Sequence, residues 1–79
     1  MTAYDLALAD VVKSELARRH RSSSDLARAV GLSPDRLRAR LQGRTGFTLP
    51  ELFAIAEAFS IEPQRLIAQV KDHLQAADD

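Results

Sequence analysis

The residue type whose grouping in this sequence points most clearly to chemistry is arginine, since eight of its nine arginines lie in one third of its 79 residues. Residues 18–44 contain eight arginines and two aspartates, which gives this segment a net charge of +6. Residues 1–17 carry −2 and residues 45–79 carry −4, so the whole chain sums to 0. Guanidinium groups pair well with phosphate and with guanine. The charge distribution therefore indicates a nucleic-acid partner, although a set of solvated helix faces is the alternative.

Other reactive residue types do not form a recognisable catalytic or metal site. The two histidines, His20 and His73, fall on different predicted elements with no carboxylate at metal-ligand spacing, so both are expected at the surface. The serines at 22–24 have no His or Lys base in a known motif, and a helix cap is the commoner use of such residues. The sequence contains no Gly-rich phosphate loop and no cysteine. We therefore expect a protein that is not an enzyme and that uses no metal, cofactor or small-molecule substrate.

The elements that must position the arginines are predicted to be five helices in one compact all-α domain. Capping signals and apolar spacing place them at residues 3–19, 23–30, 33–42, 49–59 and 63–75. Thr48 and Glu51 form the clearest capping box, and Gly31 and Gly43 stand where left-handed helix ends are expected. No strand signal occurs. Residues 1–75 are thus expected to be the domain, and residues 76–79 a frayed acidic tail.

The second and third predicted helices carry the functional hypothesis. They are joined by Gly31 and Leu32, which predicts a helix-turn-helix unit whose second helix, Ser33 to Gln42, enters the major groove of DNA. Leu37 and Leu41 must face the core, which leaves Asp35, Arg36, Arg38, Ala39 and Gln42 on or near the outer side. Arg can bond guanine in a fork, and Asp can accept from cytosine. The expected base contacts are Arg36, Arg38 and Asp35, with Pro34 offering only apolar contact.

Contacts to the DNA backbone are expected on both sides of this helix. Ser22, Ser23 and Ser24 stand at a helix N-terminus, where free N–H groups and the helix dipole favour phosphate. Arg40 lies between the inner and outer faces and is expected to meet phosphate. The loop that follows carries three further candidates, which are Gln42, Arg44 and Thr45.

These segments resemble the lambda-repressor/Cro type of helix-turn-helix domain, also called the XRE type, over about residues 8–70. The resemblance is carried by residues 23–33, by Leu37 with Gln42-Gly43-Arg44, by residues 48–56 and by residues 61–66. It implies a lambda-repressor-like five-helix fold and a sequence-specific transcriptional regulator. Such proteins are often phage repressors or antitoxins, usually dimeric, so a cytoplasmic, nucleoid-associated protein encoded by a bacterium or a phage is expected.

The resemblance also implies roles for individual residues. The family's base-reading positions fall on Pro34, Asp35, Arg36, Arg38 and Ala39, and its phosphate-binding loop amide falls on Gln42. A position that often touches both phosphate and base falls on Ser23, where the family often has Gln with a longer reach. Arg40 stands where the family often has an apolar residue, and Pro34 removes one usual polar reader.

The last two predicted helices leave two alternatives open. Ile67 and Leu74 could form a homodimer contact, and a dimer would read a near-palindromic site with half-sites about 34 Å apart. The predicted helices at 49–59 and 63–75, which lie in the acidic part of the chain, could instead bind a protein partner, which would make the chain an adaptor of the antitoxin or excision type. No apolar run approaches the ~20 residues that span a bilayer, so no membrane association is expected.

Overall fold

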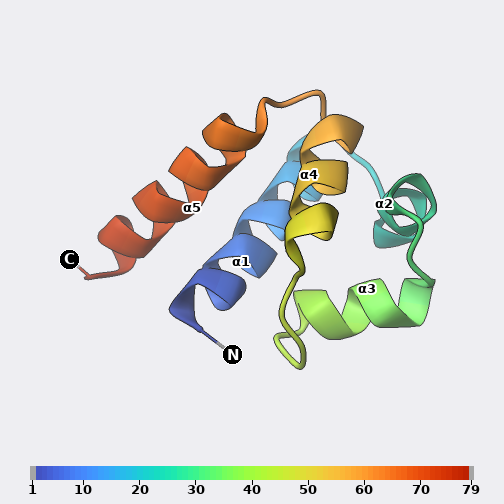
Figure 1. The fold of residues 1–79 in the computed structure, drawn as a ribbon, viewed down its shortest axis with the longest axis horizontal. Coiled ribbons are helices and arrows are strands. Elements are labelled where there is room, and N and C mark those ends of the chain that lie inside the picture. Colours follow the sequence, from blue (N-terminus) through green and yellow to red (C-terminus); the bar gives the residue numbers. More distant parts are fainter. Residues whose placement is uncertain (1, 79) are drawn as a thin grey trace.

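The computed structural model describes residues 2–78, which form five α-helices and no strand. Their bounds are α1 Ala3–Arg18, α2 Ser23–Val30, α3 Pro34–Leu41, α4 Leu49–Ala58 and α5 Pro63–Asp78 (Figure 1). The all-α expectation is confirmed, and the predicted bounds of the first four helices are correct within one residue. None of the described helices is both long and apolar enough to cross a membrane.

The end of α5 differs from the expectation. The helix continues through residue 78, so residues 76–78 of the predicted frayed tail are helical, and Asp79 lies outside the described residues. The physical reason is composition, because residues 75–78 are Gln-Ala-Ala-Asp and contain no Gly or Pro that would end a helix.

Each of the first four helices begins at a hydroxyl side chain, as predicted. The hydroxyl accepts a hydrogen bond of 3.1–3.3 Å from the backbone N–H three residues later. The four capping residues are Thr2, Ser22, Ser33 and Thr48. Reciprocal capping boxes form in α1, with Asp5, and in α4, with Glu51. These local bonds satisfy N–H groups that have no partner inside the helix.

The same four helices also end in one way. A residue with positive φ follows each helix, and the next N–H reaches back to a carbonyl five residues earlier, at 2.9–3.0 Å. The positive-φ residues are His20 (54°), Gly31 (77°), Gly43 (79°) and Ser60 (57°). Glycine takes this conformation freely, whereas a side chain there costs about 1 kcal/mol. The sequence signal located the two glycine ends only.

Every helix contributes a large, fully buried side chain to the core. Val12, Leu26, Leu37, Ile55 and Leu66 are all fully buried. Helix α1 packs against α3 and α5, and α4 packs against α2 and α5. In Figure 1, α1 and α5 run antiparallel, with both chain ends on the same side and with α2 and α3 at the other side. Because every helix contributes to one core, the orientation of α3 is fixed by the whole domain.

Candidate nucleic-acid interface

A tight turn joins α2 and α3. Gly31 adopts a left-handed conformation, and the N–H of Leu32 bonds the carbonyl of Ala27 at 3.0 Å. Leu26 of α2 and Leu37 of α3 are both fully buried. The two helices pack against each other. The buried side of α3 is set by Leu37 and Leu41, as expected from the sequence.

The opposite side of α3 carries the predicted base-contact residues. Asp35, Arg36 and Arg38 are exposed, as is Pro34 at the first helical position, whereas Ala39 is half-buried. Arg38 lies 3.3 Å from Asp35, but both side chains are largely solvent-exposed, so this ion pair is worth less than about 1 kcal/mol and can open for a ligand. The five residues thus share one short helix, with two guanidinium groups and one carboxylate directed outward.

The predicted backbone contacts lie on either side of this face. Ser22 and Ser24 are exposed at the start of α2, and Ser23 is half-buried. The Ser22 hydroxyl already caps α2 by accepting from the N–H of Asp25 at 3.1 Å. After α3, the exposed side chains of Gln42, Arg44 and Thr45 extend from a loop at residues 42–48.

This loop is packed closely on the first turn of α1. A β-carbon placed on Gly46 would lie 2.8 Å from Oδ1 of Asp5, and one placed on Gly43 would lie 3.0 Å from the Leu6 side chain. Hydrogen bonds from the backbone and the hydroxyl of Thr2 lower the pKa of Asp5, with a smaller effect from the backbone of Phe47. The carboxylate of Asp5 therefore lies against the loop as an anion. The loop is held in place by α1.

Arg40 differs from the other arginines of α3. Its Nε lies 2.8 Å from Oε1 of Glu51 in α4, and only 16% of the Arg40 side chain and 13% of the Glu51 side chain are exposed. Its Nη1 also donates to the carbonyl of Arg36 at 3.1 Å. The sequence placed Arg40 among the phosphate contacts, whereas the structure pairs it with an acidic residue of the same domain.

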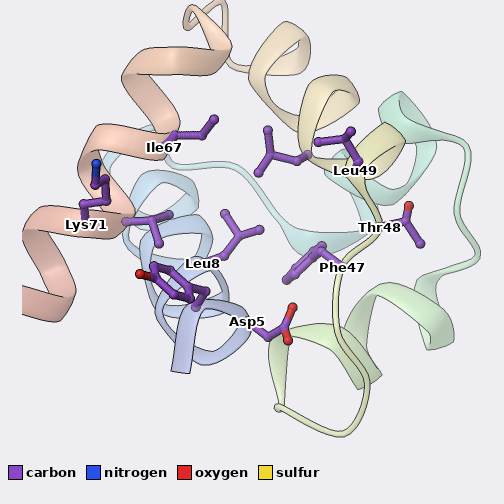
Figure 2. A pocket seen from close by; sticks show the side chains of 10 residues that line it. Asp5, Leu8, Phe47, Thr48, Leu49, Ile67 and Lys71 are labelled. Carbon is purple, nitrogen blue, oxygen red and sulfur yellow. The ribbon is translucent and has the colours of Figure 1, made fainter. Parts of the chain in front are cut away.

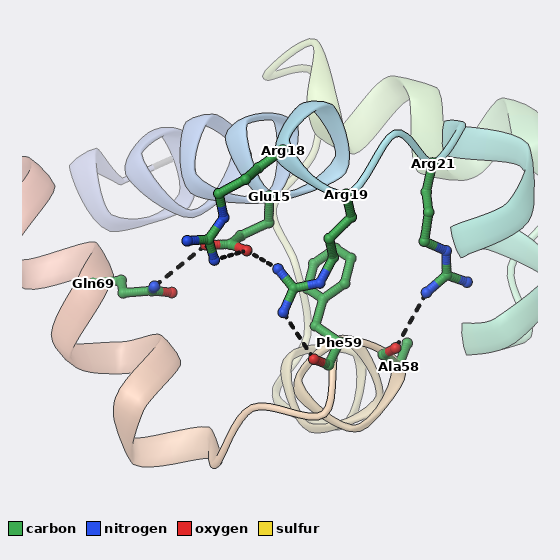
Figure 3. Close-up of polar contacts among 7 residues, drawn as sticks. All are labelled: Glu15, Arg18, Arg19, Arg21, Ala58, Phe59 and Gln69. Atoms are coloured by element: carbon green, nitrogen blue, oxygen red, sulfur yellow. Dashed lines mark hydrogen bonds and ion pairs between the residues drawn. The ribbon is translucent and has the colours of Figure 1, made fainter.

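Three more arginines of the basic segment are used inside the domain, which sequence reasoning missed (Figure 3). Arg18 and Arg19 both pair with Glu15, which is buried in α1. Burial raises the pKa of Glu15, but the hydrogen bond from Arg18 and the charges of both arginines outweigh it, so its pKa is lowered. Gln69 of α5 donates to the same carboxylate at 3.4 Å.

The end of α4 receives two of these guanidinium groups. Arg19 donates to the carbonyl of Phe59 at 2.9 Å and lies 4.9 Å from the centre of its ring, and Arg21 donates to the carbonyl of Ala58 at 3.3 Å. Cations at a helix C-terminus stabilise the unpaired carbonyls and the helix dipole. These arginines therefore join α1 and the following turn to α4.

An apolar cleft of about 440 Å³ opens between α1, α4 and α5 (Figure 2). Its walls include Leu8, Phe47 and Val70, and Ile67 and Leu49 lie at the exposed edge. The candidate dimer residues differ in exposure, since Ile67 is 42% exposed and lines this cleft, whereas Leu74 is half-buried against the core.

The two histidines are exposed, as expected, and His73 lies 3.2 Å from Asp10. Neither contributes to the surface of α3. The candidate DNA-contact residues lie at the start of α2, on α3 and in the loop at residues 42–48.

Comparisons with known proteins agree with this geometry. Two crystal structures of the clp gene regulator ClgR from Corynebacterium glutamicum have a similar fold. One has a TM-score of 0.82 and 23% identity and covers 95% of this chain and 82% of its own. The other has a TM-score of 0.79 and 19% identity, with 91% and 94% covered. No curated protein sequence matches this chain significantly. The family model of the Cro/C1-type HTH DNA-binding domain matches residues 12–72, well over half of the chain, and this protein belongs to that family.

Proposed function

We propose that this protein is a sequence-specific transcriptional regulator that binds duplex DNA with α3 in the major groove. The observation that carries the proposal is the outer face of α3, where Arg36, Arg38 and Asp35 are exposed on a helix whose inner face is locked by Leu37 and Leu41. Membership of a DNA-binding family supports it. A regulator of this kind acts by occupying a site on DNA, and repression is the simplest consequence of such occupancy.

In this proposal the polar residues of α3 read base edges. Arg36 and Arg38 bond O6 and N7 of guanine, and Asp35 accepts from N4 of cytosine. Pro34 and Ala39 offer apolar contact, which suits a thymine methyl group. Reading of this kind needs outward side chains near the start of the helix, and these residues occupy its first two turns.

Backbone contacts fix the register of the domain on DNA. They are proposed for the three serines at the start of α2, Ser22, Ser23 and Ser24, whose helix N-terminus favours a phosphate. On the other side of α3, contacts to the phosphates of the other DNA strand are proposed for Gln42, Arg44 and Thr45, which lie in the packed loop at residues 42–48. A loop that is already ordered loses less entropy on binding than a mobile one.

A second copy of the chain is proposed to complete the operator. Two domains would be joined through α5, with Ile67 at the contact and Leu74 beside it. They would present two α3 helices to a near-palindromic site whose half-sites are about one turn of DNA apart. The second candidate function, an adaptor that binds a protein partner through α4 and α5, is favoured by the apolar cleft and by Leu49 and Phe53, which are 63% and 47% exposed.

Operator selection followed by fluorescence anisotropy tests the proposal. A duplex selected from a random pool is titrated with wild type, Arg36→Ala, Arg38→Ala and, as a matched control on exposed α5, Arg65→Ala. Loss of one bidentate base contact should weaken binding by about 1–3 kcal/mol and relax choice at one base position. The control should bind as wild type does. Equal weakening on every sequence would overturn the base-contact assignment, and a folded protein with no DNA binding at low salt would favour the adaptor.

A further inference from the structure

The pair of Arg40 and Glu51 connects the DNA-facing helix to the next helix. Oε1 of Glu51 accepts from two donors, Nε of Arg40 at 2.8 Å and the backbone N–H of Thr48 at 2.9 Å. One carboxylate oxygen therefore caps α4 and holds the last turn of α3 at the same time. Both side chains are more than four-fifths withdrawn from solvent, so salt screens this pair less than it screens a surface pair.

The position of this pair in the chain matters for the loop between the helices. Residues 40 and 51 close a segment that contains the whole loop at 42–48, which carries Gln42 and Arg44. Helix α3 packs on α1 and α2 through its buried leucines. The Arg40–Glu51 pair adds a connection to α4, at the end of α3 from which the loop departs.

The pair also reduces the contribution of Arg40 to the positive surface potential around α3. Its guanidinium is bonded to Glu51 and, through Nη1, to the carbonyl of Arg36. A carboxylate at 2.8 Å neutralises the cation, so Arg40 adds little to the positive potential of the surface that carries Arg36 and Arg38. A free cation at this place would attract the phosphates of any sequence alike, because phosphate contacts carry no sequence information.

We propose that Glu51 and Arg40 are positioning residues for DNA reading, and that Glu51 keeps Arg40 off the DNA backbone. The pair holds α3 and the loop at residues 42–48 in one relative orientation, and it limits non-specific binding by neutralising one cation at the interface. The inference rests on the proposed function, because it assigns a role within the same DNA-binding surface.

Three variants separate this role from direct phosphate contact. Arg40→Met removes the charge and keeps an aliphatic stem. Glu51→Gln removes the opposing charge, while its amide oxygen can still accept from the N–H of Thr48 and preserve the cap. The double variant combines both changes. Each is titrated with the selected operator and with a random-sequence duplex over a range of salt concentrations, after its circular dichroism melt shows that it is folded, and Arg44→Met serves as the matched exposed control.

The two single variants are expected to change DNA affinity in opposite directions. Arg40→Met should weaken operator binding several-fold with an unchanged salt slope, whereas Arg44→Met should flatten the slope by about 0.9. Glu51→Gln should strengthen binding to the random duplex and steepen the slope by up to about 0.9, because it releases Arg40. This gain should vanish in the double variant, whose slope should equal that of Arg40→Met.

Two outcomes would overturn the inference while wild type still binds DNA. A slope flattened by Arg40→Met as much as by Arg44→Met would make Arg40 a phosphate contact. A Glu51→Gln effect on the random duplex that persists in the double variant would show that Glu51 does not act through Arg40. If wild type itself fails to bind any duplex, the proposed function fails first, and the role in DNA reading fails with it.

Discussion

The salt dependence of DNA binding should be much weaker than the number of arginines suggests. Residues 18–44 contain eight arginines, but four of them are bonded to buried or half-buried residues of the domain. Those four are Arg18, Arg19, Arg21 and Arg40. The remaining four are exposed and available to DNA, namely Arg28, Arg36, Arg38 and Arg44. Arg38 is counted among them because its partner, Asp35, is itself exposed and their ion pair is weak. The structure therefore sets an upper limit on the number of phosphates that one domain neutralises through this segment.

That limit gives a numerical expectation. The logarithm of the binding constant falls with the logarithm of salt concentration by about 0.9 per neutralised phosphate, so four arginines give a slope of about −3.6 per domain and eight give about −7. Between about 50 and 200 mM salt the affinity should fall at most ~150-fold per domain, compared with ~20,000-fold if all eight arginines took part.

Fluorescence anisotropy with a short labelled duplex measures this slope. A titration at low salt gives the number of domains bound per duplex, and dividing the slope by that number gives the value per domain. Arg18→Ala is the informative variant, because Arg18 is 68% exposed yet bonded to Glu15. It should leave the slope unchanged. A slope near −7 per domain, or a loss of about 0.9 in Arg18→Ala, would show that these arginines leave their partners for phosphate and would refute the reasoning.

Three further predictions concern stability. Leu26→Ala removes a fully buried side chain and should cost about 2–5 kcal/mol in urea denaturation, and a loss well under 1 kcal/mol would mean that the core refills the space. Ser60→Gly relieves a φ of 57° and should raise stability by about 0.5–1 kcal/mol in thermal denaturation, whereas a lower melting temperature would contradict the strain. The pKa of Glu15 is lowered on folding, so its stabilisation is present above its ordinary value of 4.5 and is lost as pH falls through the lower folded value. Wild type should therefore lose more stability than Glu15→Gln when urea denaturation is repeated from about pH 5 down to about pH 3, and equal losses would remove Glu15 as the cause.

The helix bounds could be predicted because their signals are local. A hydroxyl before the helix and a carboxylate three residues later, as in Thr48 and Glu51, form their bonds within one turn wherever the helix lies. Gly31 and Gly43 mark left-handed ends for the same reason. The ends at His20 and Ser60 use the same hydrogen bonds without glycine, so residue type does not reveal them.

The outer face of α3 was also predictable, since Leu37 and Leu41 fix its inner side through the helical period. The partner of Arg40 was not, because Glu51 lies across a loop whose path depends on how α1 packs on it. The bonds of Arg19 and Arg21 to the end of α4 span 40 and 37 positions of the sequence, respectively, and only the packed fold brings these groups together. The spacing of Glu15 with Arg18 and Arg19, three and four residues apart, was a local signal that could have been used.

The arginines of residues 18–44 therefore have two roles, stabilising the fold and forming the candidate interface, and a count of charges does not distinguish them. The end of α4 presents the carbonyls of its last residue, Ala58, and of its C-cap, Phe59, and Arg21 and Arg19 donate hydrogen bonds to them. These cations stabilise the fold and add little to the surface of α3. Loss of Arg19 should consequently lower the free energy of unfolding and leave the salt slope intact, while loss of Arg44 should flatten the slope and leave stability intact. Such a separation would show that the positive charge of residues 18–44 is divided between fold and interface by the packing of the helices, and not by the sequence distance from α3.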